Sequence, residues 1–232
     1  MRSQAKTKFL SGARSSLLSL ARAAAVVLLL AGFLPAGAAS AKTFEDVPPP
    51  AWAVTYIDTV TTAGIMDGCG GPFFCPYDPV TREDTAVWLE RGMRGAGFVP
   101  PPVQTSSFAD VDASYCLAPW FEQLYADHMT AGCALNPLKF CPYKVLPRSE
   151  MAVFLLRAEH GGTYQPPDWC PAGGTGSFQD VPCSHWAADW IDQLYREGIT
   201  AGCSANPPLF CPDAQVTRAQ MATFLVRTFN FH

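Results

Sequence analysis

Three arginines recur in the same local setting, six residues after the proline of a Cys-Pro pair. They lie in the segments Thr81-Arg82-Glu83-Asp84, Pro147-Arg148-Ser149-Glu150 and Thr217-Arg218-Ala219-Gln220. Thr81 and Thr217 are of the type that caps helix N-termini, so each arginine is expected in the first turn of a helix. The free N–H groups of a helix start favour anions, and a guanidinium adds a forked cation beside them. This setting predicts binding of an anionic ligand.

The chain also has nine cysteines. Six of them form three pairs at equivalent places, Cys69 with Cys75, Cys133 with Cys141 and Cys203 with Cys211. We expect a disulfide in each pair, which contributes about 2–3 kcal/mol by constraining the unfolded chain. Zinc is the alternative, but zinc sites usually offer Cys-x2–4-Cys pairs with a second pair nearby, whereas these spacings are longer and each pair stands apart. We therefore expect no metal and no cofactor.

Three cysteines remain outside these pairs. Cys170 and Cys183 flank a Gly-rich stretch, which favours them as a fourth disulfide, although the pairing among the three stays open. Cys116 stands where two equivalent positions carry Trp52 and Trp186, and we expect it to be a small buried thiol.

These features belong to three copies of one sequence unit. The copies open with Phe44-Glu-Asp-Val47, Phe108-Ala-Asp-Val111 and Phe178-Gln-Asp-Val181 and close with the arginine segments. Pro- and Gly-rich stretches separate them and read as extended connectors. We predict copies at residues 42–97, 108–161 and 178–232, with linkers at 98–107 and 162–177.

Each copy is expected to contain two helices, which makes the fold mainly α. The first helix carries an apolar stripe at i, i+4 and i+8, such as Trp186, Trp190 and Leu194. It ends at Gly64 or Gly198, or at His128 in the second copy, residue types that tolerate positive φ. The second helix begins at the arginine. Because a two-helix unit cannot bury its own stripe, the three copies are expected to pack together.

The N-terminus has the three parts of a secretory signal peptide, a basic head, an apolar run from Ala23 to Phe33 and the small residues Ala39-Ser40-Ala41. We expect cleavage after residue 41, with an uncleaved membrane anchor as the alternative. Residues 1–41 contain five of the 16 basic residues and no acidic one, which leaves 11 basic against 20 acidic residues and a formal charge of −9. That sign disfavours nucleic acid and anionic membranes as partners. No second apolar run is long enough to span a bilayer, so the mature chain is expected to be exported and soluble.

The combination of Phe-x-Asp-Val, a tryptophan eight residues on, Phe210-Cys-Pro212 and Val-Thr-Arg-Ala-Gln at 216–220 resembles the S-layer homology family. The resemblance covers the expected mature chain in the three-copy arrangement usual for that family. It implies a pseudo-threefold bundle of two-helix repeats, here with loops stapled by disulfides. It also implies a module that attaches non-covalently to secondary cell-wall polysaccharide, often through pyruvylated sugars, or to a peptidoglycan-associated polymer.

The family's Thr-Arg-Ala-Glu motif maps onto the three arginine segments, and the second copy departs from it at Pro147. We therefore expect an anionic glycan in grooves between neighbouring copies, held by Arg82 and Arg218 and least by Arg148. The resemblance implies glycan-binding residues Arg82, Arg148, Arg218, Thr81, Thr217, Trp52 and Trp186. Simpler interpretations stay open. The arginines could only pair with Asp46, Asp110 and Asp180, and the tryptophans could only pack in the core. Arg91, Arg157 and Arg227, nine residues after the motif arginines, are expected on the opposite helix face in solvent or in salt bridges.

An enzyme is disfavoured because the four histidines share no repeat position and no nucleophile-elbow or phosphate-loop pattern is present. The alternative to a glycan-binding module is a self-assembling S-layer component without a glycan site of its own. Both place the protein at the cell surface, with wall polymer or a further envelope protein as partner. They differ in whether binding to wall material depends on the attached polymer.

Overall fold

The computed structural model describes residues 44–49, 51–170, 174 and 176–231, and all of them belong to one compact unit, Ala39–His232. The expected signal peptide at 1–41 lies outside the described residues. The helices are α1 (Val54–Thr62), α2 (Arg82–Arg94), α3 (Ala118–Ala126), α4 (Arg148–His160), α5 (Ala188–Arg196) and α6 (Arg218–Phe229). The strands are β1 (Ala134–Leu135), β2 (Leu138–Lys139), β3 (Ser204–Ala205) and β4 (Pro208–Leu209), paired as two antiparallel hairpins. The described part of the chain is therefore mainly helical.

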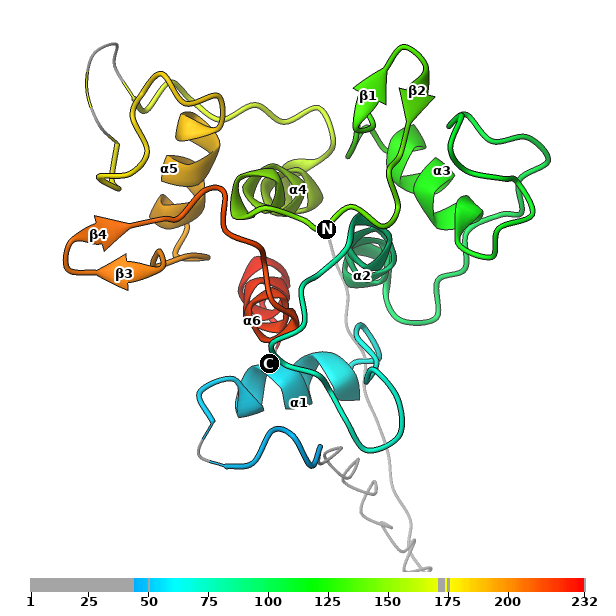
Figure 1. The fold of residues 1–232 in the computed structure, drawn as a ribbon, viewed down its shortest axis with the longest axis horizontal. Helices are drawn as coiled ribbons and strands as arrows, with labels where there is room; N and C mark the ends of the chain where they lie inside the picture. The colour runs from blue at the N-terminus through cyan, green and yellow to red at the C-terminus, as the bar shows by residue number, and fades with distance from the viewer. Residues whose placement is uncertain (1–43, 50, 171–173, 175, 232) are drawn as a thin grey trace, which may run out of the picture. The chain divides into compact units, whose positions relative to one another are not determined.

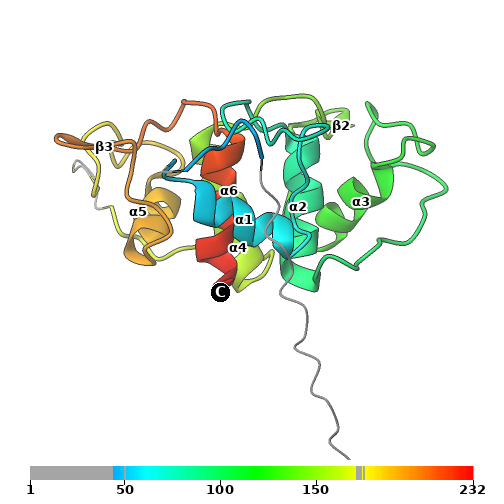
Figure 2. The same ribbon diagram turned by 90° about the horizontal axis from the view of Figure 1, so that it is seen from below.

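The second helices of the copies, α2, α4 and α6, contact one another pairwise (Figure 1). Each first helix packs on the second helix of another copy: α1 on α6, α3 on α2 and α5 on α4. The short strands lie at the same end as the N-termini of α2 and α6 (Figure 2). The apolar stripe of each first helix is thus covered by a neighbour, as expected for units that cannot bury their own stripe.

Three backbone hydrogen bonds join the copies just before the second helices. The N–H of Val80 donates to the carbonyl of Val216 (2.8 Å), that of Val216 to Leu146 (3.0 Å) and that of Leu146 to Val80 (2.8 Å). All three side chains are fully buried. Because each residue donates to one neighbour and accepts from the other, the three bonds form a closed ring.

The aspartate of each opening Phe-x-Asp-Val segment holds the loop between the two helices of its own copy. Asp110 accepts hydrogen bonds from the N–H groups of Phe140 and Cys141, both at 2.8 Å. Asp46 and Asp180 make the same pair of bonds in their copies. The aspartates therefore act as loop caps. They do not form salt bridges with the motif arginines among the described residues, contrary to the simpler pairing considered from the sequence.

Disulfides join the cysteines that flank each inter-helix loop, Cys69–Cys75, Cys133–Cys141 and Cys203–Cys211, and a fourth joins Cys170–Cys183. Cys116 is free and exposed, so the expectation of a buried thiol is wrong. Trp52 and Trp186 are 59% and 62% exposed, so they do not belong to the core stripe. The reason is the same for all three, because each precedes the start of its helix by two residues and the helical period does not yet apply.

The first helices end as the sequence predicts. Gly64, His128 and Gly198 take φ values of 70°, 60° and 74° directly after the last turn, a conformation for which glycine is best suited. No helix among the described residues is long and apolar enough to cross a membrane.

Glu90 of α2 is a fully buried carboxylate. Its Oε2 accepts a hydrogen bond from Arg94 Nε (2.9 Å), whereas its Oε1 is sealed from solvent without a partner among the described residues. Burial raises the pKa of Glu90 to about 7, although the hydrogen bond from Arg94 acts in the opposite direction. Between pH 4.5 and 7 the folded protein therefore holds a proton at Glu90 that the unfolded chain has released. The free energy of unfolding falls as the pH rises through this window.

Replacing Glu90 with glutamine is expected to remove this contribution. One pKa unit corresponds to about 1.4 kcal/mol. The free energy of unfolding of Glu90→Gln should therefore exceed that of the parent by up to roughly 3 kcal/mol at pH 8, with no such gain at pH 4.5. Urea unfolding at both pH values measures the difference, and exposed Glu45→Gln controls for the loss of one carboxylate. An equal difference at both pH values would contradict a buried, titrating Glu90.

Candidate functional site

Each motif arginine reaches out of its own copy into the inter-helix loop of another. Arg82 Nε donates to the carbonyl of Phe140, Arg148 Nε to that of Phe210 and Arg218 Nε to that of Phe74, each at 2.8 Å. The first copy thus enters the second, the second enters the third and the third enters the first. We call each such contact an arginine clasp.

The clasps are buried. Arg82 and Arg148 are 3% exposed and Arg218 is 8% exposed. Each guanidinium lies over the ring of the phenylalanine whose carbonyl it binds, at 4.7–5.1 Å from the centroid, and over a second ring from Phe154, Phe224 or Trp88. Burial lowers the pKa of all three arginines, and that of Arg148 to about 10. They remain cations at neutral pH, in surroundings where an added anion is favourable.

The helix starts do not offer the free N–H groups expected from the sequence. The N–H of Arg82 donates to the carbonyl of Lys144 and that of Glu83 to Pro142, both at 3.0 Å. Equivalent bonds begin α4 and α6. Thr81 and Thr217 close capping boxes with Asp84 and Gln220, so their hydroxyls are engaged at the helix ends. An anion must therefore be bound by side chains.

Two grooves contain a clasp arginine, a further arginine and an exposed tryptophan. The Arg148 groove has a volume of ≈ 230 Å³ and is lined by Trp52, Arg148, Thr200, Ala201, Gly202, Gln220, Thr223, Phe224 and Arg227. The Arg82 groove has a volume of ≈ 360 Å³ and is lined by residues at the equivalent positions, including Arg82, Thr130, Glu150, Phe154, Arg157 and Trp186. Residues from all three copies line each groove, so neither exists in a single copy.

The Arg148 groove carries two arginines without a carboxylate partner. Arg148 Nη2 is buried and has no hydrogen-bond partner among the described residues. No salt bridge involves Arg148 or Arg227 in that part of the chain. Arg227 instead donates to the carbonyl of Ile199 (3.1 Å) and the hydroxyl of Tyr56 (3.4 Å). The position that holds Glu150 in the second copy is Gln220 here, so this groove lacks the carboxylate that pairs with Arg82 in the other groove.

The Arg82 groove is partly neutralised. Arg82 Nη1 pairs with Glu150 Oε2 at 2.9 Å, and Arg82 Nη2 donates to Thr130 Oγ1 at 3.2 Å. Glu150 also pairs with Lys144 at 2.6 Å. Each nitrogen of the Arg82 guanidinium therefore has an acceptor, and Arg157 and Trp186 also line this groove.

The surroundings of Arg218 differ from both grooves. Arg218 Nη2 donates to the carbonyl of Asp67, and the Asp67 carboxylate pairs with Arg91 at 3.0 Å. Equivalent positions in the other copies carry Ala131 and Ala201. Cys116 stands at the repeat position that Trp52 and Trp186 hold in the two grooves. This third position thus lacks both the free cation and the exposed indole.

Arg157 and Arg227 were assigned from the sequence to solvent or salt bridges, yet both line a groove. Their helix face is opposite that of the motif arginine of the same helix, as the helical period requires. The grooves combine a clasp arginine from one copy with the later arginine of the next. A single copy contains no signal for that combination.

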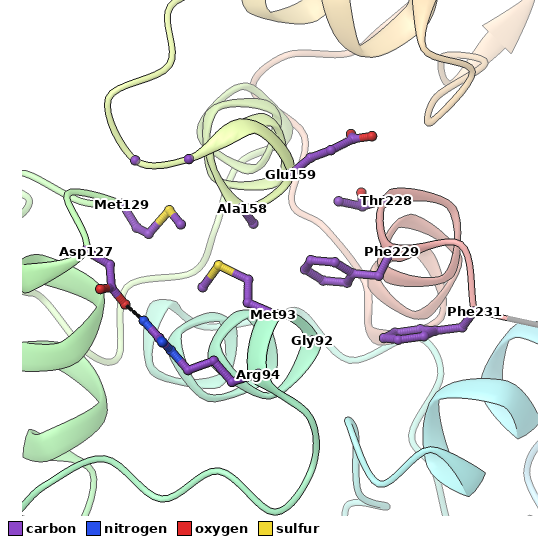
Figure 3. Close-up of a pocket in the computed structure, with 12 residues that line it drawn as sticks. Gly92, Met93, Arg94, Asp127, Met129, Ala158, Glu159, Thr228, Phe229 and Phe231 are labelled. Carbon is purple, nitrogen blue, oxygen red and sulfur yellow. Dashed lines mark hydrogen bonds and ion pairs between the residues drawn. The ribbon is translucent and has the colours of Figure 1, made fainter.

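A further hollow of ≈ 530 Å³ lies at the C-terminal ends of α2, α4 and α6 (Figure 3). Met93, Met129 and Phe229 line it, and the Arg94–Asp127 ion pair lies at one edge. Neither a clasp arginine nor an exposed tryptophan reaches it.

Comparisons with known proteins show that the chain is similar to S-layer proteins. The chain is 26% identical over 206 residues to the S-layer protein of Bacillus thuringiensis subsp. finitimus, which covers 86% of the chain and 23% of the relative. The same figures hold for the S-layer protein sap of Bacillus anthracis. A cell surface protein of Thermoanaerobacter kivui is 30% identical over 129 residues, 55% of the chain and 16% of the relative. The chain thus spans less than a quarter of the length of these relatives.

A model of the S-layer homology domain matches two stretches of the chain, 43–86 and 177–222. They cover most of the first and third copies and include Arg82 and Arg218. The chain therefore carries the S-layer homology domain at two sites and is similar to S-layer proteins over most of its length.

Proposed function

We propose that residues 108–161 are a third S-layer homology repeat and that the three repeats form a pseudo-threefold bundle. The ring of backbone hydrogen bonds and the three arginine clasps support this arrangement, because each contact recurs once per copy. The bundle is a non-catalytic module of the cell envelope. It attaches the protein non-covalently to an acidic wall polysaccharide at the cell surface.

The observation that carries the proposal is the unpartnered Nη2 of Arg148 in the Arg148 groove. A buried donor without a partner costs about 1–3 kcal/mol, and more when it is charged. A carboxylate on a sugar would accept from this donor and from Arg227, while Trp52 would stack on the sugar ring. An acidic sugar in the groove would supply that acceptor.

The Arg148 groove is the principal site and the Arg82 groove a weaker one, which reverses the order expected from the motif residues alone. In the Arg82 groove, Glu150 already pairs with Arg82, so an acidic sugar contacts Arg157 and Trp186 alone. The position around Arg218 binds no glycan, because Asp67 neutralises Arg91 and Cys116 replaces the indole. A protein of net negative charge can bind an acidic polymer in this way, because the ligand contacts local cations.

A self-assembling S-layer component is the second candidate, favoured by the names of the relatives, two of which are S-layer proteins. Sedimentation with wall sacculi before and after chemical removal of the attached polymer separates the two. Glycan binding predicts that the protein sediments only with intact sacculi. Self-assembly predicts sedimentation of the protein without sacculi, which analytical ultracentrifugation detects.

Arg227→Gln is expected to weaken binding to intact sacculi about tenfold or more, because a charge-assisted hydrogen bond contributes about 1.5–3 kcal/mol. Arg91→Gln is the matched control, since Arg91 occupies the same repeat position beside Asp67 and should leave the apparent Kd unchanged. The measurement is the depletion of protein from the supernatant over a range of sacculus concentrations. If Arg227→Gln and Arg91→Gln weaken binding to sacculi equally, the proposal that the Arg148 groove binds the glycan and the Arg218 position does not is wrong.

Trp52→Ala and Trp186→Ala test the stacking surfaces, and neither should destabilise the fold because both indoles are exposed. We expect Trp52→Ala to weaken binding more than Trp186→Ala, and the double variant to lose most of it. Thermal unfolding of each variant verifies that the fold is retained. If the double variant still binds sacculi as the parent does, the two grooves are not the glycan-binding sites.

A further inference from the structure

A second cluster of chemically active side chains lies away from the grooves, where α4 and α5 end. One ligand atom from each of Glu159, His160 and Glu197 lies within 4.8 Å of the others. Glu159 and His160 are the last two residues of α4, and Glu197 is the C-cap of α5. The cluster therefore joins the second copy to the third.

The field at this point is strongly negative. Two carboxylates face each other, and the carbonyl ends of two helices add their negative dipole charge. Among the described residues, these two carboxylates form a single ion pair, in which Glu197 Oε1 lies 2.8 Å from His160 Nε2. The nearby Arg196 lies over the Trp169 ring, with its guanidinium carbon 4.0 Å from the centroid. No lysine or arginine in this part of the structure pairs with either carboxylate.

One oxygen of Glu197 is left without any donor. Its Oε2 is sealed from solvent and has no hydrogen-bond partner among the described residues. Glu159 and Glu197 each place a carboxylate oxygen within 4.8 Å of the other, and two carboxylates this close favour a cation between them.

The surrounding residues hold the cluster in position. Gln193 Nε2 donates to Glu197 Oε1, and Trp169 Nε1 donates to Gln193 Oε1 at 2.6 Å. The ring of Tyr164 stacks on His160, with centroids 4.4 Å apart. Outer hydrogen bonds and ring contacts of this kind orient metal ligands in proteins. They also fix Glu197, whose Oε1 lies 2.8 Å from His160 Nε2.

We propose that Glu159, His160 and Glu197 bind a divalent transition-metal ion, Zn²⁺, which fastens α4 to α5. Imidazole with carboxylate is a donor set that suits zinc and disfavours magnesium and calcium, and three protein ligands leave a position for water. The prediction of no metal rests on the spacing of the cysteines, which are used in disulfides. The site is independent of glycan binding, although α4 and the segment before α5 form two walls of the Arg82 groove.

The test is calorimetric titration of the oxidised, chelator-treated full chain with ZnCl₂. We expect one Zn²⁺ per chain and a rise in Tm with added zinc, and a much weaker response to MgCl₂ or CaCl₂. Glu159→Gln should weaken zinc binding at least tenfold and lose the rise in Tm, and it should fold because Glu159 is exposed at a helix end. Glu197→Gln should do the same.

Glu45→Gln and His185→Gln are the controls, because they remove an exposed carboxylate and an imidazole elsewhere in the chain. Both should bind zinc as the parent does. No binding at one equivalent, or equal affinity in the parent, Glu159→Gln and Glu197→Gln, would overturn the proposal and leave a proton shared by the two carboxylates.

Discussion

The arrangement of the second helices depends on three buried guanidinium groups, each held by a loop of another copy. In every clasp the aspartate of the opening segment binds the N–H of a phenylalanine, and the carbonyl of the same phenylalanine accepts from the arginine. Burying a cation is costly unless hydrogen bonds and opposite charge compensate it. Here the carbonyl, two rings and the nearby aspartate supply that compensation, and all of them come from outside the copy that provides the arginine. A single copy therefore cannot satisfy its own arginine or bury its own first helix.

The clasp also explains why equivalent positions differ in what they can bind. A guanidinium has five N–H donors, and the clasp to the carbonyl uses one of them. A few neighbouring residues decide which acceptors the remaining donors find. Glu150 and Thr130 accept hydrogen bonds from Arg82, and the carbonyl of Asp67 accepts one from Arg218. Gln220 leaves Arg148 with an unused donor beside Trp52 and Arg227. Small changes around a repeated geometry thus leave one clasp arginine with an unused donor in a groove and give the other two further hydrogen-bond partners.

Much of this architecture is encoded locally and could be predicted. Helix starts at Thr81 and Thr217, helix ends at Gly64 and His128, and the cysteine pairs all follow from residue type and short spacing. The exposure of Trp52 could not be predicted, because an apolar residue just before a helix fits the i, i+4, i+8 pattern as well as a residue inside the helix does. Nor could the partner of each arginine, since Phe140 is 58 residues from Arg82 and Phe74 is 144 residues from Arg218. Grooves between neighbouring copies could be predicted from the three-copy arrangement, but their full lining could not, because residues from all three copies form each groove.

Amide hydrogen exchange of Val80, Leu146 and Val216 tests most directly whether the three copies form one interlocked structure. These amides form the closed ring that joins the copies. If the copies hold one another in place, all three amides exchange only on global unfolding, with equal free energies that match the free energy of unfolding by urea. Exchange of one of them through a local opening, with a clearly smaller free energy than the other two, would contradict the account.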